Sequence, residues 1–442
     1  MKGNIMKAIV LVCSVIILLL TSFNCKSPTA PNGSGISLTV ADVSCTEAWL
    51  NLTSSNVTFP VNLTIKSGSS VLFNASISSS DSLIYINSLL PNHTYTLQGY
   101  ITTNNKQQST TNLTVKTLDT TSSNFTWQTY TFGSPAAGSS YLNDVSLIND
   151  TTIIAVGAVY LTDSTGKAGP FPYNLIEWDG NEWHIIRVPY YYQGQTFYHP
   201  IQSVFTFGSN DIFFCGNGVI HWDGTKYNPI SIPTSKWGSY QINKIWGESN
   251  EDFYICGNNG SLAYNQNGTW QKIESGTTLP IQNIWGAVNS SSSVSQILCV
   301  ASDKYYNQGN KFIEIKNNNT AIALADSGLP WSLSSVWFIP NRKYYIAGDG
   351  VFQTTSLEKR WTEVKGLPSI YTDVIRGTNF NNIVVSGSNG TLSYFNGVRW
   401  NNYINNPLPY ISGRLVSVSI KDNTIAAVGF SGEQAYLVIG RR

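Results

Sequence analysis

Two aspartates in similar stretches of sequence are the carboxylates best placed for chemistry. Asp144 lies in LNDVSLINDTTIIAVG, and Asp373 lies in YTDVIRGTNFNNIVVSG. If such stretches meet at one opening, two carboxylates across a bound sugar would suit a glycoside hydrolase. The corresponding positions of five similar stretches hold Ser203, Lys244, Asn283, Ser335 and Ser417. Two acids in seven positions give weak support to hydrolysis, and a polysaccharide-active hydrolase or lyase stays the alternative function.

The histidines and cysteines do not have the spacing of a metal site. No two of the four histidines, His93, His184, His199 and His221, stand in an H-x-x-x-H arrangement. Nucleophile and nucleotide-binding motifs, such as G-x-S-x-G and G-x-x-x-x-G-K-[ST], do not occur. We therefore name no catalytic residue, metal or cofactor, and we leave enzymatic activity open while favouring a binding role.

Three cysteines occupy related places near a glycine in neighbouring stretches. Cys215 and Cys256 each precede the glycine directly, and Cys299 lies near the same place in the next stretch. Equivalent points of adjacent sheets should be too far apart for a disulfide. We expect all three to be buried small side chains, and we expect Cys45 to lie in a strand.

The stretch VPYYYQGQTFYHP, from Val188 to Pro200, carries more aromatic side chains than a sheet core needs. Loops on a rigid scaffold commonly carry binding function, and tyrosine binds with little loss of side-chain entropy. The candidate ligand-binding residues are Tyr190, Tyr191, Tyr192, Phe197 and Tyr198. The alternative is a loop that folds down to cover a sheet, and the sequence favours neither.

A repeat of seven copies must position these residues. An apolar stretch leading to a glycine recurs, anchored on Val145, Val204, Ile245, Ile284, Val336, Val374 and Val418. Further apolar runs follow, joined by Asp-Gly or Asn-Gly turns at Asp179, Asp223, Asn267 and Asn396. These dipeptides favour tight hairpins, so each copy is predicted to be a four-stranded meander. Such sheets bury their faces by stacking radially, as in a β-propeller.

The ends of the repeat predict how the ring closes. The last copy stops after its third strand, at Tyr436–Ile439, and a matching Trp-bearing strand, NFTWQTYTFG, precedes the first copy. Residues 125–442 give about 45 residues for each of seven copies, as propellers require. The fold class is therefore all-β: a small immunoglobulin- or fibronectin-like sandwich followed by a seven-bladed β-propeller closed by an N-terminal strand.

The tripeptide Ile-Trp-Gly and its variants lie in the predicted inner strands. The central position of this tripeptide is occupied by Trp246, Trp285, Trp337 and Phe205. Packing between sheets is the favoured interpretation, and stacking on a sugar or peptide in the channel is the alternative. The tandem motifs I-W-G and W-D-G-x-x-W resemble the repeats of bacterial cell-surface propellers, including the photosystem II assembly factor type and BNR-repeat proteins. The sialidase box S-x-D-x-G-x-x-W is not matched, because Asp179 and Gly180 are adjacent.

Residues 36–119 form a separate zone of short alternating runs. Runs such as ISLTVADV and VNLTIKSG are separated by Ser, Asn and Gly turns, which predicts an antiparallel sandwich. Leu90-Pro91-Asn92-His93-Thr94-Tyr95 resembles the tyrosine corner of fibronectin type III domains, shortened by one residue. The resemblance implies that the Tyr95 hydroxyl ties its strand to the preceding turn and that Trp49 is a core aromatic.

The first residues have the features of a targeting signal. Lys2 and Lys7 precede the apolar run from Ala8 to Leu20, which is short for a membrane span but suits a secretory signal. Cys25 and a Pro/Gly/Ser tether follow, and the arrangement resembles a bacterial lipoprotein signal with Cys25 acylated. Ser22 and Asn24 depart from the usual residues before that cysteine, so an ordinary signal or an uncleaved anchor stays open.

The predicted organisation is a signal peptide (1–24), a tether (25–35), the sandwich (36–119) and the propeller (124–442). Charged residues make up only 12% of the chain and the net charge is +1, which argues against nucleic acid as a partner. We expect a lipid-anchored protein of the bacterial cell envelope, at the outer membrane or cell surface. It would bind an envelope protein or a glycan without catalysis.

Replacing Cys25 with Ser tests the anchor. The variant should move from the membrane fraction to the soluble fraction, because lipid chains contribute about 0.8 kcal/mol per buried methylene to membrane binding. Cell fractionation with immunoblotting measures the change, and Cys13→Ser, within the apolar run, is the matched control. A Cys25→Ser protein that stayed with the membrane would remove the lipoprotein assignment.

Overall fold

The computed structural model describes residues 35–103, 106–239, 241–288, 295–304, 306, 309–316 and 320–442. The predicted signal peptide, Cys25 and most of the tether lie outside the described residues. Within these ranges the regular structure is β-strand, with two short 3-10 helices at Pro135–Ala137 and Thr234–Lys236. A search of the described residues for a long apolar helix able to cross a membrane finds none.

The N-terminal strands form two sheets. One has the order β1 (Gly35–Val43), β2 (Ala48–Ser55), β5 (Ser82–Ile86). The other has the order β4 (Ser70–Ile77), β3 (Val61–Ser67), β6 (Thr94–Thr103), β7 (Lys106–Ser109), and β8 (Leu113–Lys116) also pairs with β6.

The predicted tyrosine corner is present in this region. The Leu90 N–H donates to the Tyr95 hydroxyl at 2.8 Å, which ties the start of β6 to the turn before it. Trp49 is buried on β2, and its ring centroid lies 5.5 Å from that of Tyr85. Cys45, predicted to lie in a strand, is buried in the turn between β1 and β2. Membership of the fibronectin type III family and the boundaries of this domain stay predictions.

Residues from 126 onward form seven four-stranded antiparallel sheets in the described part of the chain. The innermost strands are β10 (Tyr141–Leu147), β16 (Ser203–Gly208), β20 (Ile242–Ser249), β24 (Ile281–Val288), β28 (Leu333–Ile339), β32 (Thr372–Asn379) and β36 (Arg414–Lys421). The second strands are β11 (Ile153–Val159), β17 (Asp211–Cys215), β21 (Asp252–Gly257), β25 (Ser295–Ser302), β29 (Lys343–Gly348), β33 (Asn382–Gly387) and β37 (Thr424–Ser431).

The outer half of each sheet comes from the two remaining strands. The third strands are β12 (Tyr173–Trp178), β18 (Val219–Trp222), β22 (Leu262–Gln266), β26 (Asn310–Lys316), β30 (Gly350–Thr354), β34 (Leu392–Phe395) and β38 (Gln434–Arg441). The outermost strands are β13 (Trp183–Ile186), β19 (Tyr227–Ile230), β23 (Thr269–Lys272), β27 (Thr320–Ala323), β31 (Thr362–Glu363), β35 (Trp400–Asn402) and β9 (Thr126–Phe132). A separate hairpin joins β14 (Tyr190–Tyr192) and β15 (Gln195–Phe197).

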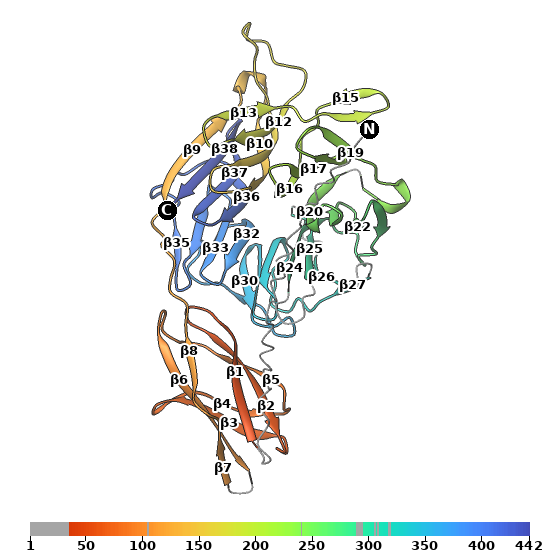
Figure 1. Ribbon diagram of the computed structural model, residues 1–442. Helices are drawn as coiled ribbons and strands as arrows, with labels where there is room; N and C mark the ends of the chain where they lie inside the picture. Colours follow the sequence, from red (N-terminus) through yellow and green to blue (C-terminus); the bar gives the residue numbers. More distant parts are fainter. Residues whose placement is uncertain are drawn as a thin grey trace, which may run out of the picture. The chain divides into compact units, whose positions relative to one another are not determined.

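The seven sheets close into a ring around one centre, as Figure 1 shows. Each innermost strand contacts the innermost strand of the next sheet, and β36 of the last sheet contacts β10 of the first. Strand β9 completes the last sheet by pairing with β38, from Ala435 opposite Phe132 to Arg441 opposite Thr126. The predicted closure by the N-terminal strand is therefore confirmed.

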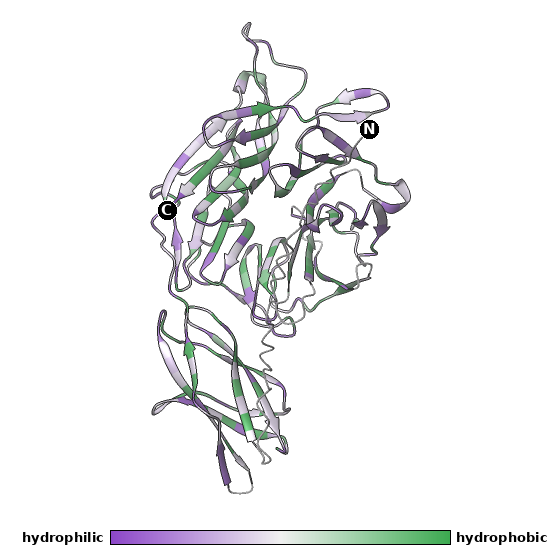
Figure 2. Ribbon diagram, in the orientation of Figure 1, coloured by the Kyte–Doolittle hydropathy of each residue, from purple (hydrophilic) through white to green (hydrophobic). Residues whose placement is uncertain are grey.

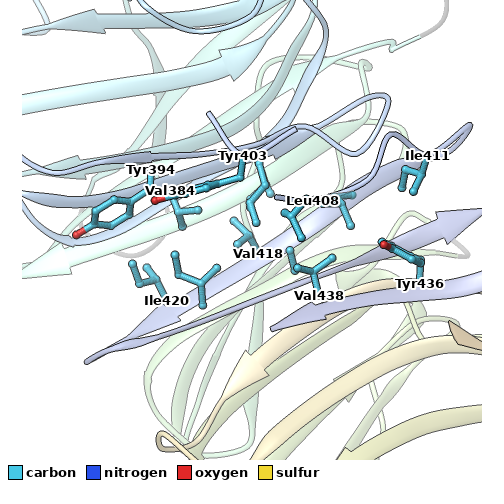
Figure 3. Packing of buried hydrophobic residues seen from close by; sticks show 14 residues of the cluster. Val384, Tyr394, Tyr403, Leu408, Ile411, Val418, Ile420, Tyr436 and Val438 are labelled. Atoms are coloured by element: carbon cyan, nitrogen blue, oxygen red, sulfur yellow. The ribbon is translucent and has the colours of Figure 1, made fainter. Parts of the chain in front are cut away.

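Apolar side chains fill the spaces between neighbouring sheets. Hydrophobic residues recur along the inner and middle strands in Figure 2, and all seven residues of β11 are buried. Between the sixth and seventh sheets, Val384 and Tyr394 of one sheet share a cluster with Val418 and Val438 of the other (Figure 3). A sheet that is apolar on both faces is stable only between two neighbours, so the ring supplies what one sheet lacks.

The recurring Ile-Trp-Gly is a contact between consecutive sheets. The buried ring of Trp246 packs so closely on Gly286 of the next sheet that any Cβ there would collide with it. Trp337 lies in the same way over Gly377, where a Cβ would come within 2.7 Å of the indole. The tryptophan and the glycine thus form one contact, found at two junctions between consecutive sheets. The packing interpretation is confirmed for Trp246 and Trp337.

Replacing Gly286 with Ala tests this contact. The added methyl must displace the Trp246 indole, and overpacking of this kind typically costs about 1–3 kcal/mol of unfolding free energy. Urea denaturation measures the loss. Gly208→Ala is the matched control, because that strand glycine has nothing within 4 Å of its Cβ position. Equal stabilities of the two variants would contradict the packing role of Ile-Trp-Gly.

Candidate functional site

A one-residue bulge recurs near the start of six of the seven innermost strands. It interrupts the register at one point, between Leu142 and Asp144 in the first sheet for example. The bulged residues are Asn143, Asn243, Gln282, Ser334, Asp373 and Val416. Bulges re-aim side chains, and all six of these line one cavity at the centre of the ring.

This central cavity has a volume of about 660 Å³ and a largely polar lining. The amide side chains are Asn143, Gln202, Gln241, Asn243, Asn258, Asn259, Gln282 and Asn283. The charged side chains are Asp144, Asp303, Asp373, Lys244, Lys304 and Arg414. Phe430 is the single aromatic lining residue in the part of the chain that the structure describes. We call this cavity the mouth.

Some of the amides are partly used to join neighbouring sheets. The Asn143 amide donates to the Ile201 carbonyl at 2.9 Å, and the Asn243 amide donates to the Ile281 carbonyl at 3.1 Å. Their side-chain oxygens keep acceptor capacity. The half-buried side chains of Gln202 and Gln241 have no hydrogen-bond partner among the described residues, so both their donors and acceptors are available to a ligand.

Asp144 is the most constrained group of the mouth. Its carboxylate lies 2.6 Å from the Lys244 ammonium and accepts from the hydroxyls of Ser203 at 2.8 Å and Ser417 at 2.7 Å. The backbone N–H groups of Val145 and Val204 also donate to it. Five donors fill the roughly four lone-pair sites of a carboxylate. Burial alone would raise the pKa of Asp144, but Lys244 and these hydrogen bonds hold it below the ordinary value.

Asp373 is held by a different partner. Nε and Nη2 of Arg414 donate to its two oxygens at 3.0 and 2.6 Å, in a bidentate pair. Burial raises the pKa of the Asp373 carboxyl, and the charges of Lys304 and Arg414 oppose that rise.

The predicted equivalence of Asp144 and Asp373 is wrong. Asp144 pairs with Val156, just before the glycine of β11, and in the sixth sheet Val374 takes the matching place opposite Ser386. Asp373 is the bulged residue one position earlier. The two carboxylates nevertheless line the same mouth, because the bulge turns Asp373 toward it.

The same one-residue offset conceals a further candidate residue in the sequence. With the register of the structure, Ile375-Arg376-Gly377 is the sixth copy of Ile-Trp-Gly, so Arg376 takes the place of a tryptophan. The sixth copy can be found in the sequence if the repeat is anchored on Ile375. Anchoring it on Val374 shifts the alignment of this copy by one residue. Arg376 lines a second cavity of about 100 Å³, which shares Asp144 and Lys244 with the mouth. We call this second cavity the inner chamber.

Arg376 is buried and firmly positioned. Its Nη1 donates to the Ser335 hydroxyl at 2.9 Å and to the Ile375 carbonyl at 2.8 Å, and its Nη2 donates to Asn283 Oδ1 at 3.3 Å. The guanidinium lies 4.5 Å from the ring centroid of Trp285, a cation–π contact. Burial lowers the pKa of Arg376 to about 10, which still leaves it charged at neutral pH. Trp285 therefore lines the inner chamber, unlike Trp246 and Trp337.

One end of the aromatic hairpin β14–β15 packs against the protein. Tyr190 packs on the buried cluster that contains Val188 and Phe214, and the hollow beside it measures about 20 Å³. A hollow of that size has room for about one water molecule. This end of the hairpin covers a sheet, as the alternative interpretation supposed.

The other hairpin aromatics are spread over different surroundings. Phe197 stacks on His199 with ring centroids 5.5 Å apart, and Tyr198 lies edge-on to Phe171 at 5.7 Å. Tyr191 is exposed over 53% of its surface, and the backbone of Tyr192 pairs with Gln195. The five candidate residues therefore form no single pocket in the described structure, and their role in ligand binding stays a prediction.

The only cluster of potential metal ligands found among the described residues is a hairpin turn. Asp179, Glu182 and His184 offer ligand atoms within 4.8 Å of one another, and the His184 Nε2 lies 2.8 Å from Asp179. In the next sheet Lys226 and Asn228 take the places of Glu182 and His184, and Asn228 donates to Asp223 at 2.8 Å. The same turn thus forms where no such ligand set exists, so turn chemistry accounts for the cluster.

The cysteines are buried in the sheets, as expected. Cys215 pairs with Ser203 and Cys256 with Lys244, whereas Cys299 lies one position away, opposite Ile284. All three are free and buried. Burial raises the pKa of the Cys256 thiol to about 12, so it is not a reactive thiolate at neutral pH.

Comparison with known proteins supports the ring architecture. No family model and no curated protein matches the sequence. A solved structure of YCF48 bound to D1 peptide matches with a TM-score of 0.52 at 15% identity, over 72% of this chain and 97% of the other. At this identity the likeness shows the fold alone, which is a β-propeller.

Two further solved structures are less similar. The C-terminal WD40 domain of Sif2 has a TM-score of 0.41 at 14% identity, covering 79% of this chain and 90% of its own. The extracellular domain of the hybrid two-component system BT3049 from B. thetaiotaomicron has a TM-score of 0.39 at 12% identity, covering 89% and 64%.

Replacing Asp144 with Asn tests the buried ion pair. The change leaves Lys244 charged without its partner, and breaking such a pair typically costs about 3–5 kcal/mol. Because the folded pKa of Asp144 is lowered, its contribution is present above the ordinary value of 3.8 and is lost as the pH falls through the folded value. Urea denaturation at neutral and acid pH should therefore show the variant and the wild type converging in acid.

The double variant Asp144→Asn/Lys244→Met is the matched control. It removes both charges, so most of the stability lost in the single variant should return. A single variant as stable as the wild type at pH 7 would show that the pair is dispensable.

Proposed function

We propose that the chain is a lipid-anchored envelope protein whose propeller binds a polar segment of a protein or glycan without changing it chemically. The mouth supports this function, because it offers amide donors and acceptors on a rigid ring. Half-buried Gln202 and Gln241 present hydrogen-bonding groups that no neighbour in the described structure uses. Ligand sites typically place a small number of such polar groups on an otherwise preformed scaffold.

The saturation of Asp144 is the observation that carries this proposal. A glycosidase needs two carboxyls that can give or take a proton or attack a sugar. Asp144 already accepts five hydrogen bonds, one from Lys244, so it has no free lone pair with which to act. Asp373 is engaged by Arg414 on both oxygens. The charged groups of the mouth therefore serve positioning and binding rather than hydrolysis.

Hydrolysis is the second candidate, favoured by one observation. Asp144 and Asp373 line the same cavity together with Arg414, which is the convergence that an enzyme requires. Burial also raises the pKa of Asp373, as suits a general acid. Assays on polysaccharides with the wild type and Asp373→Asn distinguish the candidates: turnover lost in the variant would establish the hydrolase.

The proposed location rests on the sequence. The short apolar run, Cys25 and the tether support attachment to the bacterial envelope through a lipid, at the outer membrane or cell surface. The YCF48 structure holds a D1 peptide, which is a property of that protein. A propeller can carry a peptide, and this supports a polypeptide as one of the two proposed classes of ligand.

Replacing Gln202 and Gln241 with Ala tests the mouth as the binding site. An envelope-protein and glycan array probed with the full chain identifies a ligand, and calorimetry then measures its affinity. The double variant should bind about tenfold more weakly or worse, because each lost hydrogen bond contributes about 0.5–1.5 kcal/mol. Stability should not change, since neither side chain bonds to a described neighbour.

Three variants of the aromatic hairpin separate it from the mouth. Gln195→Ala, at the exposed tip of the hairpin, should bind normally. Tyr191→Ala and Tyr198→Ala test the hairpin itself. If the tyrosine variants lose binding while the double variant of Gln202 and Gln241 binds normally, the binding site is the hairpin and not the mouth.

A further inference from the structure

The inner chamber carries one positive charge more than its own residues neutralise. Lys244 and Arg376 line it, and Asp144 is the only carboxylate among its described lining residues. The Asp144 carboxylate pairs with Lys244 at 2.6 Å. Arg376 makes no ion pair within the described part of the chain, and its hydrogen bonds go to neutral oxygens. Buried charges are ordinarily paired, so an uncompensated guanidinium needs an explanation.

The geometry of Arg376 leaves a defined set of donors free. Its hydrogen bonds use Nη1 and one hydrogen of Nη2, so the Nε–H and the other Nη2 hydrogen have no acceptor in the described structure. In the mouth, Arg414 uses the same two nitrogens to hold both oxygens of Asp373. This fork matches a carboxylate, and in Arg376 it is unoccupied by any described side chain.

We propose that the inner chamber binds a single carboxylate group, with Arg376 as the ligating residue and Lys244 as the second cation. The site shares Asp144 and Lys244 with the mouth but includes neither Gln202 nor Gln241. It goes beyond the proposed function, so either can hold without the other. The carboxylate belongs to a free small acid or to the C-terminus of a polypeptide. Both present the same planar monoanion.

Size and charge together select this class of ligand. A cavity of about 100 Å³ is smaller than the ~150 Å³ that accommodates a benzene ring, so it admits a carboxylate but not a sugar ring. One excess positive charge matches a monoanion, and the nearby Asp144 carboxylate disfavours a dianion such as phosphate. The face of Trp285 beside the guanidinium excludes water from one side, which strengthens the interaction.

Thermal unfolding and calorimetry of the full chain with sodium acetate test the proposal. The buffer is a bulky sulfonate at constant ionic strength, which the inner chamber is too small to admit. Acetate should raise the melting temperature saturably, because a ligand that binds only the folded state stabilises it. A tripeptide with a free carboxyl terminus and the same peptide amidated distinguish the sources. A response to the free peptide but not to the amide identifies a polypeptide end, and a response to acetate alone identifies a small acid.

Variants of the two cations make the test specific. Arg376→Met should weaken acetate binding about tenfold or more, since charge-assisted hydrogen bonds are lost. Without acetate it should be at least as stable as the wild type, because an uncompensated charge has been removed. Arg399→Met, an exposed arginine outside the channel, makes the same change in net charge and should respond to acetate as the wild type does.

A second variant covers the case in which Arg376→Met does not fold. Lys244→Met leaves one cation for the one carboxylate, so it should also bind acetate about tenfold more weakly. The proposal is overturned if acetate has no saturable effect on the wild type, or if the effect persists in both cation variants. It is also overturned if chloride and acetate act with equal strength, which would show a general anion site.

Discussion

Close packing between consecutive sheets is the constraint on which the ring depends, and at two junctions a tryptophan of one sheet packs directly on a glycine of the next. Trp246 on Gly286 and Trp337 on Gly377 are the two copies of this contact. The contact fixes how closely the adjacent inner strands approach, and it leaves each sheet dependent on its neighbour for cover. Apolar residues then fill the remaining space between the sheets, as the shared cluster of Val384 and Val438 shows. Stability is therefore a property of the closed ring.

The recurring bulge gives this ring a polar centre. One extra residue in six inner strands turns side chains such as Asn243 and Asp373 toward the mouth. Beyond the bulge, normal alternation resumes and places Arg376 at the level that tryptophan occupies elsewhere. A symmetric apolar scaffold thus carries an asymmetric set of functional groups, because the residue at each bulge is free of the packing that constrains its neighbours.

Much of the architecture can be predicted from the sequence. The Asp-Gly and Asn-Gly turns, the repeated glycines and the unmatched strand near Trp127 predict the sheets and the closure by β9. The site is only partly accessible from the sequence, because a bulge has no local signature. Val374 and Ile375 are both apolar, so the hydrophobic periodicity cannot decide which of them is the anchor of the sixth copy. Choosing Val374 removes Arg376 from the position that tryptophan holds in other copies. The partner of Asp144 is also hidden, since Lys244 lies in another sheet.

The pairing of β9 with β38 also has a consequence for biosynthesis. Phe132 pairs with Ala435, so the two strands are separated by about three hundred residues of chain. At about 5–20 residues per second, translation makes β9 some ~15–60 s before its partner exists. Throughout that interval the strand presents an open edge on which any extended segment could dock. The nascent protein is thus most vulnerable to misassembly at the segment that later completes the ring, and a holding chaperone would best protect it there.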